Sequence, residues 1–181
     1  MGQDVPPTLL NIGCGAIKLD GWIGVDAYGD PDVRHDLNVI PWPFKDNSVD
    51  KILAAHVFEH LENWWGAFEE CVRILKPYGL LDFRVPHDSS STALTYRDHL
   101  HVFSSNSFYG IEGTRCGTNN WAGSQPRLPM RIVSYQLIPF REYQRIFNLF
   151  PRIGRWLAIH GRNFIHEQRF IFEKLPPRST P

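Results

Sequence analysis

Two features near the N-terminus carry the residue types that bind a nucleoside. The segment Asn11-Ile12-Gly13-Cys14-Gly15 ends an apolar run with Gly-x-Gly, and Asp26 closes the next apolar run. Glycines allow a sharp turn and leave backbone amides open to a ligand. An acidic residue after the second strand of a doubly wound sheet can accept hydrogen bonds from ribose hydroxyls. The spacing therefore predicts a nucleoside site at the carboxyl ends of two strands.

The same spacing fits a nicotinamide dinucleotide poorly. The dinucleotide fingerprint G-x-G-x-x-G needs a third glycine and an acid about 20 residues further on. Here the third glycine position is Lys18, and Asp26 follows Gly13 by only 13 residues. We therefore favour a cofactor that has a ribose but no pyrophosphate.

The histidines are the other residues with chemical potential. Residues 56–60, HVFEH, spell the H-x-x-E-H motif of inverted zinc proteases, in which Glu59 would be the general base. However, the motif directly follows a predicted strand, and the helical pattern starts only at Leu61. We therefore expect no metal site and keep zinc proteolysis as a remote alternative. His60 is expected to begin the helix without a chemical role.

Three further histidines, His87, His99 and His101, fall in the polar middle of the chain. His87 follows a predicted strand and would open onto the ligand face of the sheet. A neutral imidazole there can take a proton from a hydroxyl or an amine. The candidate catalytic residues are His56, His87 and His99, and the alternative is that these are ordinary loop histidines.

Apolar runs predict the strands that must position these residues. Continuous rather than alternating runs are typical of parallel strands covered on both faces. The predicted strands are Thr8–Ile12, Trp22–Asp26, Val33–Asp36, Ile52–Ala55, Leu80–Val85, Met130–Ile138 and Phe164–Leu175. With a helix between the fourth and fifth strands, this order predicts an α/β fold with a doubly wound, mostly parallel sheet.

The helices are predicted from apolar residues three and four positions apart. One helix spans Leu61–Leu75 and ends at Lys76-Pro77, where Pro-Tyr-Gly would form a turn. Residues 86–128 are expected to form long loops with a short helix near Ser104–Gly110. Residues 140–158 are expected to be helical with breaks at Pro151 and Gly154, and the PPRSTP tail is expected to fray.

The composition is that of a single globular domain over residues 1–181. Apolar residues make up 43% and charged residues 21%, which argues against a disordered chain. The odd set Cys14, Cys71 and Cys116 indicates reduced thiols. We see neither a signal peptide nor the run of about 20 apolar residues that a membrane span needs, and we expect a cytoplasmic protein.

The zero net charge hides an asymmetry along the chain. Residues 1–100 carry 8 basic and 15 acidic residues, whereas residues 126–181 carry 10 basic and 3 acidic residues. The basic C-terminal third suits contact with a membrane surface or a nucleic acid, and the alternative is a basic solvated face.

Several segments together resemble the class I, seven-stranded S-adenosylmethionine-dependent methyltransferases, and within them a short predicted-methyltransferase branch. These segments are LNIGCG, GWIGVD, HDLNVIPWPFKDNSVDKILAAHVFEHL and CVRILKPYGLLDFRVPHD, which lie within residues 9–88. HVFSSNSF and HEQRFIFEKL are weaker continuations of the same resemblance. The resemblance implies a Rossmann-like fold and S-adenosylmethionine as the cofactor.

The resemblance also implies roles for individual residues. Gly13, Cys14 and Gly15 would line the amino-acid end of the cofactor, and Asn11 is counted with them as cofactor-binding. Asp26 would hold the ribose, Asp36 and Leu37 would flank the adenine, and His56 would lie near the methyl group or the cofactor tail. Two features depart from the family. Only eight residues separate Gly15 from Gly24, so the first helix must be shortened or absent, and Tyr78 stands where the turn usually has glycine.

The implied reaction is direct displacement of the methyl group by an unidentified acceptor. By analogy with similar short methyltransferases, the first expectation is a small molecule or glycan, such as a lipid-linked sugar. The alternatives are a nucleic-acid methyltransferase and a non-catalytic nucleoside-binding protein on the same fold.

Overall fold

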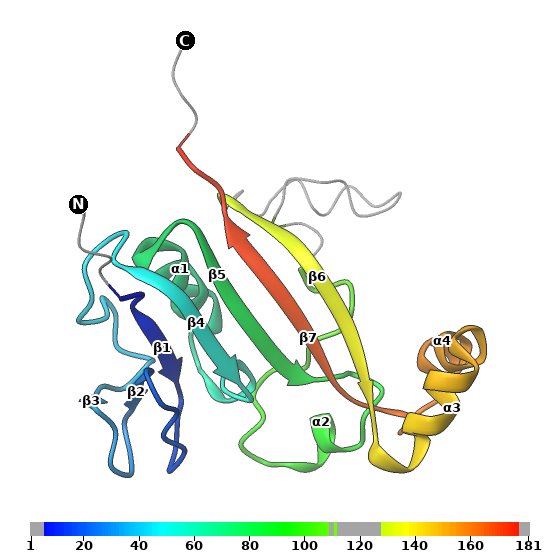
Figure 1. The fold of residues 1–181 in the computed structure, drawn as a ribbon. Helices are drawn as coiled ribbons and strands as arrows, with labels where there is room; N and C mark the ends of the chain where they lie inside the picture. Colours follow the sequence, from blue (N-terminus) through cyan, green and yellow to red (C-terminus); the bar gives the residue numbers. More distant parts are fainter. Residues whose placement is uncertain (1–5, 109–110, 112–127, 178–181) are drawn as a thin grey trace.

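A computed structural model of the chain describes residues 6–108, 111 and 128–177, which form one seven-stranded sheet (Figure 1). The strand order is β3-β2-β1-β4-β5-β7-β6. The strands are β1 (Leu9–Ile12), β2 (Ile23–Asp26), β3 (Val33–Arg34), β4 (Val49–Ala55), β5 (Leu75–Pro86), β6 (Met130–Pro139) and β7 (Ile165–Lys174). Strands β1 to β5 pair in parallel, and β7 pairs antiparallel with both β5 and β6. The predicted α/β fold with a mostly parallel sheet is confirmed.

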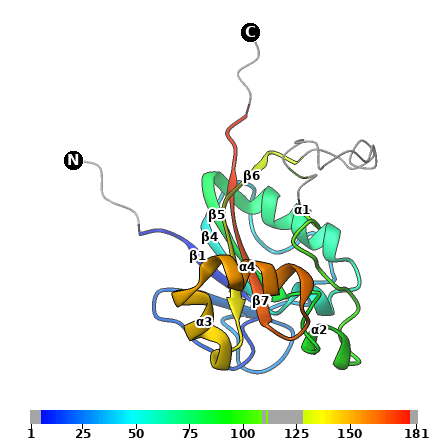
Figure 2. The ribbon, with the colours of Figure 1, turned by 90° about the vertical axis from the view of Figure 1, so that its right-hand side faces the viewer.

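The helices are few and short. They are α1 (Trp64–Ile74), α2 (Thr92–Thr95), α3 (Gln144–Leu149) and α4 (Pro151–His160), with 3-10 turns at η1 (Phe58–His60) and η3 (Arg141–Tyr143). Asn63 caps α1, because its side chain accepts a hydrogen bond from the Gly66 N–H. In Figure 2, α1 and α2 lie to one side of the sheet, and α3 and α4 lie in front of one end.

The core lies between α1 and one face of the sheet, and it is built largely of phenylalanine. Phe83 of β5 is fully buried at its centre, with ring centroids 4.7 Å from Phe58 and 4.9 Å from Phe108. Phe68 of α1 and Phe172 of β7 close the cluster, with centroids 5.3 Å apart. This packing fixes the strand ends on which the functional residues lie.

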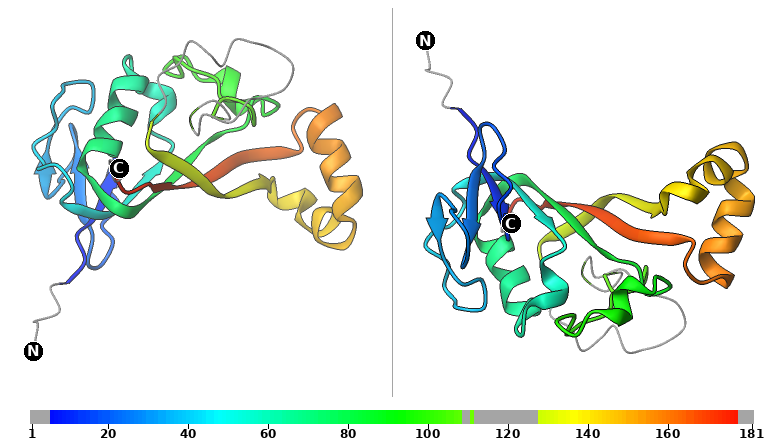
Figure 3. Two further views of the ribbon diagram at one scale, coloured as in Figure 1. Left: turned by 90° about the horizontal axis from the view of Figure 1, so that it is seen from above. Right: turned by 90° about the horizontal axis from the view of Figure 1, so that it is seen from below.

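No helix among the described residues covers the opposite face of the sheet (Figure 3). Asp82 of β5 points to that face, yet its side chain is only 4% exposed. It is enclosed by two arginines, with Arg84 Nη2 at 3.1 Å and Arg169 Nη2 at 2.7 Å from Asp82 Oδ2. Burial raises the pKa of Asp82, but the bonds from Arg169 and Arg84 outweigh it and hold that pKa below its usual value. The carboxylate therefore stays ionised and links β5 to β7.

Near β1 and β2, the opposite face of the sheet lacks a covering helix in the described part of the chain, because the segment between these strands is short. Residues 13–22 form turns without a helix, so the chain passes directly from the glycine turn into β2. Eight residues between the two glycines are too few for a helix that returns along the sheet. The prediction of a shortened or absent first helix is confirmed.

Several element boundaries differ from the sequence predictions. The helix begins at Trp64 rather than Leu61, because η1 precedes it, and β5 begins at Leu75, so the predicted Pro-Tyr-Gly turn lies inside a strand. Tyr78 there adopts φ +67°, a conformation that favours glycine, at the point where the resemblance implies a glycine.

Two helix predictions need correction. Gly154 does not break the C-terminal helix: it lies inside α4, where its missing side chain lets α4 pack against Phe147 of α3. Residues 105–108 form turns rather than the predicted helix, and residues 109–110 lie outside the described part of the chain. Most of the predicted tail lies outside it as well.

Candidate functional site

A pocket of about 600 Å³ opens at the carboxyl ends of β1, β2 and β4. Its lining brings together Gly13, Asp26, Asp36, Leu37 and His56, five of the residues that the sequence marks as candidates. The remaining lining residues are Ala27, Tyr28, Asn38, Val57, His60, Leu61, Asp98 and Leu100. We call this the cofactor pocket.

The glycine turn makes the floor of the cofactor pocket. Gly13 has φ +62°, and its N–H donates to Val25 O at 2.8 Å, which fastens the turn to β2. A Cβ at Gly13 would overlap the side chain of Val57 just beyond β4. Both the backbone conformation and the close approach therefore require glycine at this position.

Asp26 ties the two sides of the pocket together. Its Oδ2 accepts the Gly15 N–H at 2.8 Å, and its Oδ1 accepts the Tyr28 N–H at 2.9 Å. A carboxylate oxygen has lone pairs for more than one hydrogen bond, so Asp26 can still accept ribose hydroxyls. The carboxylate thus shapes the turn in addition to facing the pocket.

The wall beside β3 combines one acid with apolar side chains. Asp36 Oδ1 accepts the Asn38 N–H at 2.9 Å, which holds the loop after β3 in a tight turn. Leu37 is buried and lies with Val57 and Leu61 in the pocket lining. Apolar side chains beside a hydrogen-bonding loop suit a flat aromatic base such as adenine.

Three predicted cofactor residues do not line the pocket. Asn11 is buried in β1, and its Nδ2 donates to Ile17 O at 3.4 Å. Cys14 is buried behind the turn, where burial raises the pKa of its thiol, and a Cβ at Gly24 would lie 3.0 Å from its Sγ. Gly15 acts through the bond to Asp26. The structure places these three residues as supports of the glycine turn.

His56 lies where β4 ends, with φ +57°. Its Nε2 is 2.6 Å from Glu167 Oε2, and its Nδ1 is 3.2 Å from Glu59 Oε1. These bonds, first that to Glu167 and then that to Glu59, raise the pKa of His56 to about 9. At neutral pH the ring is therefore an imidazolium that donates both hydrogens to carboxylates. In that state it does not accept a proton from another group.

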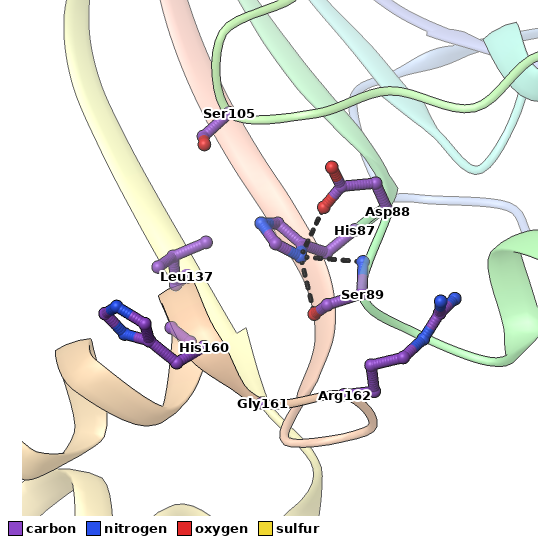
Figure 4. Close-up of a pocket in the computed structure, with 9 residues that line it drawn as sticks. His87, Asp88, Ser89, Ser105, Leu137, His160, Gly161 and Arg162 are labelled. Atoms are coloured by element: carbon purple, nitrogen blue, oxygen red, sulfur yellow. Dashed lines mark hydrogen bonds and ion pairs between the residues drawn. The ribbon is translucent and has the colours of Figure 1, made fainter.

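A second pocket, of about 370 Å³, opens at the carboxyl end of β5 (Figure 4). We call it the His87 pocket. Its lining is mostly polar and comes from the segment after β5, from the turn at residues 105–108, from β6, and from α4 with its connection to β7. The residues are His87, Asp88, Ser89, Ser105, Leu137, Ala158, His160, Gly161 and Arg162.

His87 is buried, and its ring is fixed by its own loop. Ser89 N–H donates to Nδ1 at 3.2 Å, Ser89 Oγ lies 2.8 Å from the same nitrogen, and Asp88 Oδ1 lies 3.1 Å from it. Burial lowers the pKa of His87, although the negative charge of Asp88 acts in the other direction and raises it. A neutral ring whose Nδ1 accepts an amide hydrogen carries its proton on Nε2. In Figure 4 this second nitrogen faces away from Asp88 and Ser89, into the pocket.

Strand β7 connects the histidines of the two pockets. Glu167 binds His56 of the cofactor pocket, and the neighbouring His166 O accepts the His87 N–H at 3.4 Å. The rings of His56 and His166 have centroids 5.9 Å apart. β7 therefore holds residues of both pockets in fixed relation.

His99 and His60 lie together at the edge of the cofactor pocket, with ring centroids 4.8 Å apart. His60 ends the single turn η1, and His56 precedes that turn. The continuous helix that the zinc-protease motif requires is absent from residues 56–60, because α1 begins only at Trp64. His99 does not line either pocket.

Sequence reasoning missed the partners of His56 and the far wall of the cofactor pocket. Glu167 is separated from His56 by 111 residues, and no local pattern connects them. Tyr28 follows Asp26 by two positions, so its place beside Asp26 in the pocket lining follows from chain proximity alone. Asp98 and Leu100 lie in the polar middle segment, where residue type gives no signal.

Known proteins share both the domain and the fold. Residues 27–83 match the model of a methyltransferase domain family. No curated protein has a sequence that matches this chain. Among the described residues, no helix is long and apolar enough to cross a bilayer.

Several solved structures have a similar fold at low sequence identity. An S-adenosylmethionine-dependent methyltransferase from Archaeoglobus fulgidus is 17% identical, with 93% of this chain and 86% of that chain covered and a TM-score of 0.60. The cyclase SpnF is 14% identical, with 95% and 76% covered and a TM-score of 0.58. A chain of the Haloferax volcanii complex that contains the methyltransferase activator Trm112 is 17% identical, with 94% and 83% covered and a TM-score of 0.55.

The domain match includes the lining residues of the cofactor pocket from Ala27 to Leu61 and extends into β5. The reversed β7 between β5 and β6 completes the seven-stranded topology of that fold. Residues 27–83 thus match a methyltransferase domain family, and the described chain has the Rossmann-like fold of solved S-adenosylmethionine-dependent methyltransferases.

Proposed function

We propose that this chain is an S-adenosylmethionine-dependent methyltransferase that acts on a hydroxyl group of a sugar-like acceptor in the His87 pocket. The observation that carries the proposal is the arrangement of two pockets at adjacent strand ends, one after β4 and one after β5. S-adenosylmethionine supplies a methyl group that its sulfonium makes electrophilic. The chain supplies binding and alignment, which are worth about 7–11 kcal/mol of barrier in favourable cases.

The lining of the cofactor pocket supports the binding of an adenosyl group. Asp26 offers carboxylate oxygens for the ribose, and Leu37 with Leu61 offers apolar surface for the adenine. Gly13 lines the pocket, and the amino-acid end would approach its backbone at the turn. Asn11, Cys14 and Gly15 would hold this arrangement from behind.

The His87 pocket offers hydrogen-bonding groups of the kind that bind sugar hydroxyls. His87 Nε2–H donates into the pocket, Asp88 supplies a carboxylate that accepts from a hydroxyl, and Arg162 supplies a cation. In this proposal His87 orients the acceptor oxygen, and the Asp88 carboxylate takes the hydroxyl proton when the oxygen is methylated. His56 positions the carboxylates around it rather than taking the proton, because both of its ring nitrogens already donate.

The helical hairpin α3–α4 favours an acceptor at a membrane surface. Its exposed apolar side chains are Ile146, Leu149, Phe150, Ile153 and Trp156, and its exposed arginines include Arg145 and Arg152. Apolar side chains beside cations suit an anionic bilayer, whereas nucleic-acid interfaces are more polar. Because Ala158 and His160 of α4 line the His87 pocket, a hairpin on the bilayer would bring that pocket to a lipid-linked acceptor.

The test separates the cofactor pocket from the acceptor pocket. S-adenosylhomocysteine is expected to raise the melting temperature of the wild type, and Asp26→Asn is expected to weaken its binding by about tenfold or more, because the ribose loses a charged acceptor. The matched control, Asp20→Asn, changes an exposed acid of the same segment and is expected to bind like the wild type.

Acceptor use is measured with methyl-labelled S-adenosylmethionine and a panel of glycosides, with and without a polyprenyl phosphate. His87→Gln is expected to bind S-adenosylhomocysteine normally but to lose transfer. Failure of the wild type to bind S-adenosylhomocysteine would overturn the cofactor assignment. Normal binding without transfer to any glycoside would overturn the acceptor class and favour a nucleoside-binding protein or, with labelled RNA or DNA, a nucleic-acid enzyme.

A further inference from the structure

A cluster of metal-ligating side chains lies at the edge of the cofactor pocket. Glu59 and His60 come from the turn η1, and His99 comes from the loop after α2. One potential ligand atom from each of these residues lies within 4.8 Å of the other two. We propose that Glu59, His60 and His99 bind a divalent transition-metal ion such as Zn²⁺.

The first support is a pair of buried polar atoms that lack partners. Glu59 is only 1% exposed, and its Oε1 bonds to His56 while its Oε2 has no hydrogen-bond partner among the described residues. His99 Nδ1 is likewise buried without a partner. An unpaired buried carboxylate oxygen is costly, and a cation between these atoms would satisfy both of them.

The second support is the tautomer of His60. Its Nδ1 lies 3.0 Å from Asp98 O, and a carbonyl oxygen can only accept, so Nδ1 carries the hydrogen. Nε2 then has a free lone pair, which is the form that binds a metal. Metal-bound histidines commonly donate their other N–H to a backbone carbonyl in this way.

The third support is that the two segments are already fastened together. The N–H groups of Leu100 and His101 donate to Glu59 O at 2.7 and 3.2 Å. Nitrogen and oxygen ligands of tetrahedral zinc lie about 2.0–2.2 Å from the ion, and hence about 3.4 Å from one another. Small side-chain rotations can close the remaining gap without moving the backbone.

This site differs from the zinc-protease motif and from the expectation that the chain binds no metal. His56 of that motif is already held between Glu59 and Glu167, and His99 takes its place. His60, Asp98 and Leu100 also line the cofactor pocket, so the ion would lie at the pocket rim, open to a further ligand. The inference does not depend on the identity of the acceptor.

The experiment is zinc titration by calorimetry of full-length protein that has been stripped with chelator and dialysed. One Zn²⁺ per chain is expected, with a rise in melting temperature. His99→Ala and His60→Ala are each expected to weaken binding by about a hundredfold or more, since loss of an outer partner alone costs 10–100-fold. His35→Ala is the matched control, because the half-buried His35 side chain lies outside the cluster and bonds only to Val39 O among the described contacts.

Folding of each variant is checked by circular dichroism and by thermal unfolding without metal, because His60 lines the cofactor pocket and S-adenosylhomocysteine binding would not report on folding alone. Three results would overturn the proposal: no zinc binding by the wild type, binding with Mg²⁺ of equal strength, or unchanged zinc affinity in both His99→Ala and His60→Ala. The last result would assign the bound zinc to other residues of the chain.

Discussion

At the scale of single residues, His56 has the most informative surroundings. A histidine at the end of the fourth strand could be read from the sequence, and so could its nearness to a ligand. Its protonation could not, because that depends on Glu167, which reaches it from β7. The pKa of Glu167 is lowered in turn, chiefly by its bond to His56. The pair therefore acts as a fixed ionic contact at the pocket edge.

This contact makes stability depend on pH. The pKa of His56 is raised from 6.5 to about 9 in the folded protein, so its contribution is complete below pH 6.5 and is lost as pH rises through about 9. The melting temperature of the wild type is expected to fall across this range more steeply than that of His56→Gln, measured by thermal unfolding. His35→Gln serves as the control and should keep the wild-type slope. Parallel curves for the wild type and His56→Gln would contradict the pairing.

At the scale of elements, the sequence predicted the parts that depend on local pattern. The glycine turn, the seven strands and α1 follow from glycine spacing and apolar periodicity, and each lies within a few residues of its predicted place. The chain order of β6 and β7 was visible, but the insertion of β7 between β5 and β6 rests on long-range pairing that no window of sequence contains. The His87 pocket was foreseen only as a histidine after a strand, because its other walls come from β6 and α4.

The uncovered sheet face gives a prediction about elements. Asp82 joins β5 to β7 through Arg169, and removing its charge would leave two arginines without their partner. Asp82→Asn is expected to lower the free energy of unfolding by about 2–3 kcal/mol in urea denaturation. Asp30→Asn is the control: its side chain is 96% exposed, and a change within about 0.5 kcal/mol is expected. Equal stability of the two variants would mean that the contacts of Asp82 with the arginines make no net contribution to the free energy of unfolding.

At the scale of the whole molecule, the two ends of the sheet differ in charge. The acidic half of the sequence builds β1 to β4 and the cofactor pocket, and the basic part builds β6, β7 and the hairpin at the far end (Figure 1). Between residues 140 and 164 the chain has five arginines and only Glu142 as an acid. The charge asymmetry of the sequence therefore corresponds to two ends of the molecule, and the basic end carries the exposed apolar side chains of α3–α4.

We therefore expect the protein to bind vesicles through α3–α4. Leu149 is 72% and Trp156 is 59% exposed, and arginines near an anionic surface contribute about 1 kcal/mol each. Flotation with vesicles of phosphatidylcholine and phosphatidylglycerol should retain the wild type, and phosphatidylcholine alone should retain much less. Leu149→Ser with Trp156→Ser is expected to abolish retention, whereas Leu94→Ser, an exposed leucine on α2, leaves it intact. Loss of retention in Leu94→Ser to the same degree, or equal binding to both vesicle types, would show that the hairpin is not the docking surface.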